Sequence, residues 1–316
     1  MKRHPLNPLS ATATAILALA LTGLLFLAGA TPASAGGKSP HRPGHPQSIA
    51  VNGQVSTPAS YSVADLAALP QTTLPDDRHR QARGGLTGVL LESLITAAAP
   101  QTPEVKNADL RVSVVVAGKR GAVAATLAEL QPRFGNHPAL LVTQGHGRHA
   151  RTNLVFPGDR GHRRTVRDVG SITVSVADPA LPTGLPTGAI TIRTDRGSVV
   201  VTARRLAKLP QVTRTVTFAS GSGQQTRVET GPTLAAVLRA AHVRTTPTSV
   251  VAAIADDGYV STVTPGEATS GRRTLLVSLV EDGIALTQPR LVADGDIAGG
   301  RYVSGLLGLQ VTDTCR

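Results

Sequence analysis

Cysteine and aromatic residues are nearly absent from this 316-residue sequence, and each absence excludes a class of site. The single cysteine, Cys315, cannot build an intramolecular disulfide, a cysteine-based zinc site or an iron–sulfur cluster. There is no tryptophan and aromatics make up 2% of the residues, so a nucleic-acid surface of stacked rings is not expected. The core must come from valine, leucine, isoleucine and alanine.

Acidic residues are the minority charge. The chain has 32 Lys and Arg against 20 Asp and Glu, which gives a formal net charge of +12. This balance favours an anionic partner, either a small molecule or a cell-wall polymer. Nucleic acid is not expected as a partner, because no nucleic-acid-binding motif is present.

Long apolar runs are confined to the N-terminus. Lys2 and Arg3 precede an apolar stretch at residues 15–30, and Ala33-Ser34-Ala35 is a small-residue cleavage site. This pattern predicts a secretory signal peptide at residues 1–35 and a secreted, extracytoplasmic mature protein with no further membrane span. Retention of the segment as a membrane anchor is the alternative. In a secreted chain, the odd thiol of Cys315 is a candidate for an intermolecular disulfide.

Two stretches rich in proline and glycine divide the chain. The composition of residues 36–47 predicts a flexible linker. Three prolines and two glycines at residues 178–188 predict a second linker. The expected domains are therefore residues 48–177 and 189–314.

The two expected domains repeat one another. Each begins with an alternating strand-like segment and continues into a short helix, capped by Ser62 or Thr202 and stopped by a Leu-Pro pair. Each then has a Thr-Gly pair, at Thr87 and Thr230, that is expected to begin a second helix. Later landmarks share a constant offset of 137: Gly121/Gly258, Leu154/Leu291, Asp159/Asp296, Arg164/Arg301 and Val174/Val311.

Strands dominate the expected secondary structure. About four further strands and two short helices are predicted in each half. A doubly wound sheet would place a helix after nearly every strand, so the pattern favours two tandem modules of mixed α+β class, strand-rich with short helices.

Short signatures recur in a fixed order along the mature chain. They are V-N-G-Q-V at residues 51–55, D-L-A-A-L-P at 65–70, L-V-F-P-G-D at 154–159, A-D-D-G-Y-V at 255–260, R-L-V-A-D-G-D at 290–296 and G-R-Y-V at 300–303. This order resembles the molybdopterin-binding domain of the sulfite-oxidase family, in the short form found in secreted bacterial proteins, as two tandem copies. The resemblance implies a mixed α+β fold and a pocket for a phosphorylated pterin, molybdopterin.

One departure from that family concerns the metal. In catalytic members a cysteine thiolate, in the loop after the Leu-Pro helix, holds molybdenum. The corresponding stretches here, residues 71–80 and 213–223, contain no cysteine. Ser220 is the nearest small polar residue, and His79 lies in the first stretch. Because molybdenum is a soft metal that prefers thiolate, redox catalysis is not expected from these residues.

A basic cluster lies between residues 144 and 167. It predicts a site for a phosphate or another anion, because arginine forks match phosphate oxygens and glycines let the backbone approach a ligand. A solvated basic loop is the alternative. The candidate ligand-binding residues of this cluster are His146, Arg148, His149, Arg151, Arg163 and Arg164. The histidines are not expected to bind a metal, since no carboxylate or thiol completes a ligand set.

Four further candidates come from the second half. The resemblance implies that Ser220, Tyr259, Arg290 and Arg301 border a cofactor pocket. For Tyr259, the Asp257-Gly258 pair also predicts a plain hairpin turn.

Two functions remain open from the sequence. The first is a redox protein that binds a pterin-type cofactor. The second is a non-catalytic extracellular module that keeps the fold and binds anionic ligands or cell-wall polymers.

Overall fold

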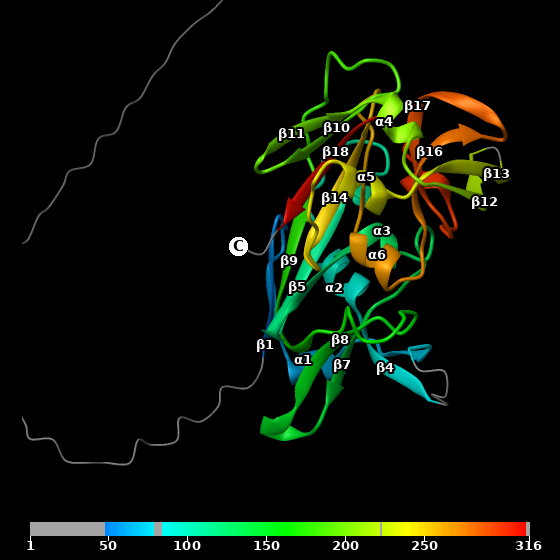
Figure 1. The fold of residues 1–316 in the computed structure, drawn as a ribbon. Helices are drawn as coiled ribbons and strands as arrows, with labels where there is room; N and C mark the ends of the chain where they lie inside the picture. Colours follow the sequence, from blue (N-terminus) through cyan, green and yellow to red (C-terminus); the bar gives the residue numbers. More distant parts are fainter. Residues whose placement is uncertain (1–47, 79–83, 222, 314–316) are drawn as a thin grey trace, which may run out of the picture. The chain divides into compact units, whose positions relative to one another are not determined.

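Two five-stranded sheets with one shared strand order organise the chain. The computed structural model describes residues 48–78, 84–221 and 223–313 (Figure 1). The first sheet has the order β2-β1-β9-β5-β6 and the second β11-β10-β18-β14-β15. The first contains β1 (Ser48–Gly53), β2 (Ala59–Ser62), β5 (Val112–Arg120), β6 (Ala122–Thr126) and β9 (Arg167–Val176). The second contains β10 (Ile190–Thr194), β11 (Gly197–Val201), β14 (Ser249–Ala255), β15 (Val260–Val263) and β18 (Leu306–Asp313).

The strand directions are also the same in both sheets. In each, one pair is parallel, β1 with β9 and β10 with β18, and the other pairs are antiparallel. Val51 lies opposite Ile172 in the first parallel pair, and Ile192 lies opposite Leu309 in the second. These β-branched and leucine side chains alternate between the faces, so one face of each sheet is apolar and buried.

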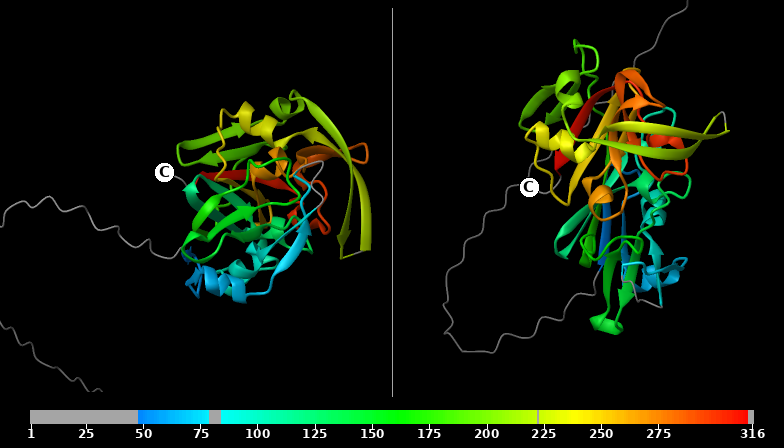
Figure 2. Two further views of the ribbon diagram at one scale, coloured as in Figure 1. Left: turned by 90° about the horizontal axis from the view of Figure 1, so that it is seen from below. Right: turned by 45° about the vertical axis from the view of Figure 1, so that its right-hand side comes forward.

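Two four-stranded sheets complete the strand architecture. Their orders, β3-β4-β7-β8 and β12-β13-β16-β17, again correspond. The first contains β3 (Thr72–Pro75), β4 (Gly85–Leu90), β7 (Leu140–Gln144) and β8 (Arg151–Val155). The second contains β12 (Gln211–Ser220), β13 (Gly223–Pro232), β16 (Leu275–Glu281) and β17 (Ile284–Ala293). Both views in Figure 2 show the β12–β13 hairpin extending away from the five-stranded sheets.

The helices are short and begin at hydroxyl caps. Ser62 forms a capping box with Asp65 at the start of α1 (Val63–Ala68), and Thr202 caps α4 (Ala203–Ala207), as the sequence predicts. The remaining α-helices are α2 (Leu91–Ala97), α3 (Leu127–Leu130), α5 (Leu234–Ala240) and α6 (Pro265–Thr269). The described residues also form three 3₁₀ turns: η1 (Ala108–Arg111), η2 (Gly147–His149) and η3 (Gly299–Arg301).

Two expectations about helices are corrected. The Thr-Gly pairs lie in β4 and β13, and the second helix predicted in each half begins three residues after the glycine, at Leu91 and Leu234. The estimate of about two helices per half missed α3 and α6, because a single turn carries no periodic pattern. The mixed, strand-rich class holds: the short helices and two pairs of sheets are compatible with two α+β modules.

The apolar core is divided between the halves. One large cluster of buried side chains comes from the second half and another from the first. Leu154 and Leu291, 137 residues apart, are each fully buried in their own cluster. A smaller cluster joins Leu110 and Phe134 of the first half to Tyr259 and Ala298 of the second, so apolar contacts also cross between the halves.

Several expectations fall on residues that the structure does not describe. The predicted signal peptide, the first linker, His79 and Cys315 lie outside the described residues. Residues 178–188, the second predicted linker, carry neither helix nor strand. Within the described ranges, no helix is both long and apolar enough to cross a membrane.

The glycine of each Thr-Gly pair sits where two strands approach closely. A Cβ at Gly231 would lie 2.0 Å from the carbonyl oxygen of Val277, and one at Gly88 would lie 2.5 Å from that of Leu141. We expect Gly231→Ala to lower the free energy of unfolding by about 1–3 kcal/mol, because β13 and β16 must separate to make room for the methyl group. Urea unfolding followed by circular dichroism measures the change.

Gly170→Ala is the matched control for this prediction. Gly170 also lies in a strand, but a Cβ there meets no atom within 4 Å, so its free energy of unfolding should change by less than about 0.5 kcal/mol. Equal effects of the two substitutions would contradict the close approach at Gly231.

Candidate functional site

Two buried arginines, one in each half, lie in matching networks of ion pairs. Arg301 is 0% exposed and Arg164 is 4% exposed. An unpaired charge in such a place would cost several kcal/mol, so each guanidinium requires carboxylate partners. The structure supplies them from the same positions in both halves.

Arg301 is held by two carboxylates. Its Nε and Nη2 donate to Oδ2 and Oδ1 of Asp296 at 2.7 and 2.6 Å, and its Nη1 donates to Oε2 of Glu267 at 2.6 Å. Arg273 adds a second cation, with its Nη1 2.6 Å from Oδ1 of Asp296. The fork of the guanidinium thus matches one carboxylate with two parallel hydrogen bonds.

Arg164 repeats this geometry in the first half. Its Nε and Nη2 donate to Asp159 at 2.8 and 2.6 Å, and its Nη1 donates to Oε1 of Glu129 at 2.6 Å. His137 takes the place of Arg273, with its Nε2 2.8 Å from Oδ1 of Asp159. The guanidinium carbon also lies 3.9 Å from the centre of the Phe156 ring.

Local sequence places these side chains. Thr126 caps the single turn α3 and Thr264 caps α6, which fixes Glu129 and Glu267 at the third helical position of their turns. In each half an aspartate follows a glycine and precedes the arginine by five residues. The turn between them returns the chain so that the fork meets the carboxylate.

Burial and charge act against each other on these groups. Burial raises the pKa of Glu129, and the nearby Glu267 raises it further against the effect of Arg164. Burial likewise raises the pKa of Asp296. At Asp159, hydrogen bonds from Arg164 and His137 outweigh burial and leave the pKa below its usual range. Around both arginines the carboxylates outweigh burial and raise the guanidinium pKa, so both remain charged.

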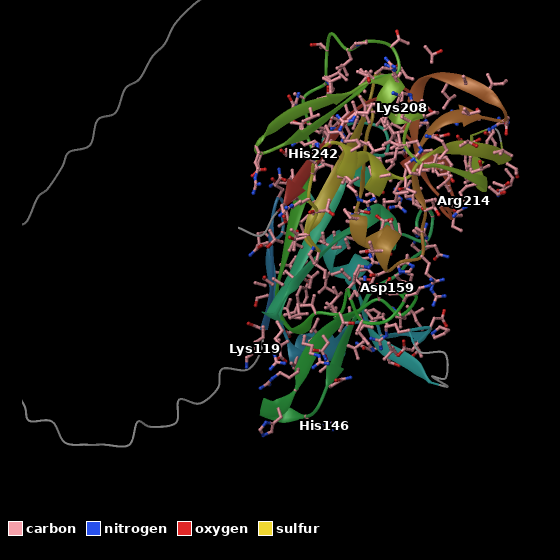
Figure 3. All side chains as sticks on the ribbon, viewed as in Figure 1. Lys119, His146, Asp159, Lys208, Arg214 and His242 are labelled. Atoms are coloured by element: carbon pink, nitrogen blue, oxygen red, sulfur yellow. The ribbon has the colours of Figure 1, made fainter. Side chains whose placement is uncertain are left out.

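The two networks meet where the halves join. A Cβ at Gly266 of α6 would lie 2.9 Å from Cδ of Arg164, and Nη2 of Arg273 donates to the carbonyl oxygen of Gly135. The backbone N–H of Arg160 donates to Ser270 at 2.9 Å. Figure 1 shows α3 and α6 next to each other at this junction, and Figure 3 marks Asp159 there. The networks therefore hold the two halves together as well as neutralising charge.

The other candidates of the second half also have structural partners. The Tyr259 hydroxyl donates to Gly300 at 2.6 Å and accepts from Asn107 of the first half at 3.3 Å, and burial raises its pKa. Its neighbour Gly258 lies in the turn between β14 and β15. Arg290 pairs with Glu229 at 3.0 Å and with Glu281, two glutamates that lie directly opposite each other in β13 and β16.

The basic cluster at residues 144–167 is divided by the fold. Arg164 is internal, whereas His146, His149, Arg151 and Arg163 are exposed. The side chain of Arg148 lies outside the described residues. Figure 3 shows His146 at the far end of the β7–β8 hairpin, distant from Asp159.

Exposed cations lie on three neighbouring strands beside that hairpin. Arg120 of β5 is directly opposite Arg167 of β9, and Nε of Arg151 in β8 lies 3.5 Å from Asp168 of β9. Lys119 precedes Arg120 and is exposed as well. We name this set, Lys119, Arg120, Arg151 and Arg167, the basic strand-end surface.

The repeat does not impose this surface. At the offset of 137, the equivalents of its four cations in the second half are Asp256, Asp257, Gln288 and Ser304. Positive charge at these positions is thus a property of the first half alone, and not a requirement of the scaffold.

The residues present do not fit the molybdenum centre that the resemblance implies. The stretch 213–223 belongs to the β12–β13 hairpin, and a thiolate ligand for this soft metal is missing from it. Ser220 is exposed at the end of β12, where it accepts from Gln225 at 2.8 Å and donates to Gly223 at 3.4 Å. Among the described residues, no group of three or more His, Cys, Asp or Glu side chains could hold a metal ion.

Comparison with known proteins finds a remote structural likeness. No family model and no curated protein matches the sequence. Among solved structures, the sulfane dehydrogenase SoxCD from Paracoccus pantotrophus is 14% identical with a TM-score of 0.29, over 75% of this chain and 76% of that chain. A likeness this remote establishes neither activity nor ligand, and the sulfite-oxidase type of the modules stays a prediction.

Sequence reasoning missed the carboxylates of the networks. Asp159 and Asp296 each follow a glycine, which indicates a turn, but a Gly-Asp pair does not show that the carboxylate points inward. The signal that points to them is a combination: Thr-x-x-Glu followed by Asp-x-x-x-x-Arg, present in both halves. The sequence around Arg164 and Arg301 also does not indicate that they are buried. Both were candidate ligand-binding residues, but their N–H groups donate to carboxylates of the protein.

The buried networks yield a stability prediction. We expect Arg301→Met to lower the free energy of unfolding by about 3–5 kcal/mol, because Glu267 and Asp296 lose the guanidinium that neutralises them while both carboxylates remain buried. Arg301→Lys should recover part of this loss, since it restores the charge but not the paired geometry. Urea unfolding gives the free energies, and exposed Arg204→Met, with an expected change within about 0.5 kcal/mol, is the control. A loss at Arg301 no larger than that at Arg204 would contradict the network.

Proposed function

We propose that this protein is a secreted, non-catalytic binding module for anionic ligands, with cell-wall polymers as the partner class, built from two tandem α+β modules. The observation that carries the proposal is the basic strand-end surface. It presents four exposed cations on neighbouring strands, with Asp168 close to Arg151.

The chemistry of this surface suits an extended polyanion. Arginine forks bind phosphate and carboxylate oxygens, and a row of exposed cations follows a polymer better than it encloses a small molecule. His146 and His149 continue the surface along the β7–β8 hairpin. The positive charge of the whole chain also raises the local concentration of anions.

Removal of the arginines tests the proposal. We expect the triple variant Arg120→Gln, Arg151→Gln, Arg167→Gln to bind inorganic polyphosphate about tenfold more weakly, since each exposed contact contributes roughly 0.5 kcal/mol. The loss should shrink as salt is raised, because salt screens exposed charges. Titration calorimetry measures both, with inorganic phosphate as a separate arm that distinguishes a small anion from a polymer.

A second triple variant controls for net charge. Arg204→Gln, Lys208→Gln, Arg239→Gln removes the same charge from the exposed side of α4 and α5. This variant should keep nearly the original affinity for polyphosphate. An equal loss in both triple variants would overturn the assignment of the surface.

The redox alternative rests on the ordered signatures and makes the opposite prediction about metal. Without a cysteine ligand, we expect protein purified from its native export route to contain molybdenum far below one atom per chain. Elemental analysis by mass spectrometry decides the question. Stoichiometric molybdenum would reject the non-catalytic function and favour a pterin-dependent redox protein.

A further inference from the structure

The first half fills a space beside its sheet with its own chain. After β1, residues 54–57 fold over the end of α2 and form a bridge between Val55 and Pro100. Three backbone hydrogen bonds secure this segment: from Ser56 to Ala99 at 2.9 Å, from Thr57 to Ala98 at 3.0 Å, and from Gln101 to Gln54 at 3.0 Å.

Side chains of the same segment complete the closure. Val55 is 5% exposed and packs in the apolar core of the first half. The N–H of Gln54 donates to the carbonyl oxygen of Val174 at 2.9 Å, and its side-chain oxygen accepts from the N–H of Val176 at 2.7 Å. The space is thus filled by an extended segment with one apolar side chain directed inward.

The second half has the same walls without the filling segment. Ala241 and His242 follow α5 as Ala98 and Ala99 follow α2, and His242 and Ala99 share a left-handed backbone, with φ of 59° and 51°. β10 and β11, however, are joined by a tight turn at Asp195 and Arg196. This turn is too short to reach across to the end of α5.

A groove of about 810 Å³ occupies this place. One wall is the β10–β11 turn, the other is the chain from Ala241 to Arg244, and the floor includes Val311 and Asp313. Val311 and Asp313 are the equivalents, at the offset of 137, of Val174 and Val176, which contact Gln54 in the first half. Figure 3 marks His242 at the edge of this region.

We propose that this groove binds an extended, acidic peptide segment, with one apolar side chain placed as Val55 is placed in the first half. The first half supplies the template for the backbone and for the apolar contact. This site is separate from the basic strand-end surface, which belongs to the other half of the chain.

The exposed arginines at the groove are the basis for an acidic ligand. Arg196, His242 and Arg244 line it and are exposed. Two acids, Asp195 and Asp313, line it as well, and both have partners within the protein. Oδ1 of Asp313 accepts from the hydroxyls of Thr246 at 2.8 Å and Thr248 at 2.6 Å. The arginine forks at the opening therefore remain the groups suited to a carboxylate on the peptide.

Labelled peptides with the sequence of residues 53–58 provide the probe. Fluorescence anisotropy should show saturable binding of an acidic form that carries Gln54→Glu and Ser56→Glu, about fivefold tighter than the unmodified sequence. A form that also carries Val55→Asp should bind at least about tenfold more weakly than the acidic form, because a charge cannot enter an apolar socket without a partner.

Variants of the protein locate the binding. Arg196→Glu with Arg244→Glu should weaken binding of the acidic peptide about tenfold or more, whereas Arg204→Glu with Lys208→Glu, the same charge change on α4, should leave it nearly unchanged. The triple variant of the basic strand-end surface should also keep peptide binding. The peptide site and the proposed polymer surface can therefore be tested independently of each other.

Two results would overturn the proposal. One is the absence of saturable binding of the acidic peptide to folded protein. The other is an equal loss of binding in the groove variant and in the α4 variant, with both folded by circular dichroism.

Discussion

Burying a guanidinium in each half imposes a constraint on which much of the structure depends. Arg164 and Arg301 are removed from water, so each requires a carboxylate at the distance and angle of its fork and a second carboxylate from a separate turn. This requirement accounts for the Asp five residues before each arginine and for the capped single turns α3 and α6. It also brings the two halves together, because Arg164 packs against α6 and Arg273 reaches the backbone of the first half.

Much of the scaffold follows from sequence alone. Alternation of β-branched residues predicted the central strands, and hydroxyl caps before Leu-Pro predicted α1 and α4. The ion-pair networks could not be predicted from the sequence. The spacing of Asp296 and Arg301 indicates a turn but does not show that both side chains point inward, and Glu267 is separated from Arg301 by 34 residues. The long β12–β13 hairpin was also incompletely predicted, since many of its side chains are exposed and polar.

The two halves share topology but differ where they meet solvent. In the first half a segment after β1 covers the end of α2, and in the second a tight turn leaves the equivalent place open. Four cations on the first half correspond to two aspartates, a glutamine and a serine on the second. Strand order and buried ion pairs are thus retained in both halves, while binding surfaces vary with short turns and exposed side chains, which affect stability little.

The central claim is that the paired arginine networks make the two halves one cooperative unit. Differential scanning calorimetry of the whole protein at neutral pH tests it most directly. The account predicts a single transition whose calorimetric and van't Hoff enthalpies agree, because neither half can lose its structure without exposing the other's buried charges. Two separate transitions, each with the enthalpy of one half, would contradict it.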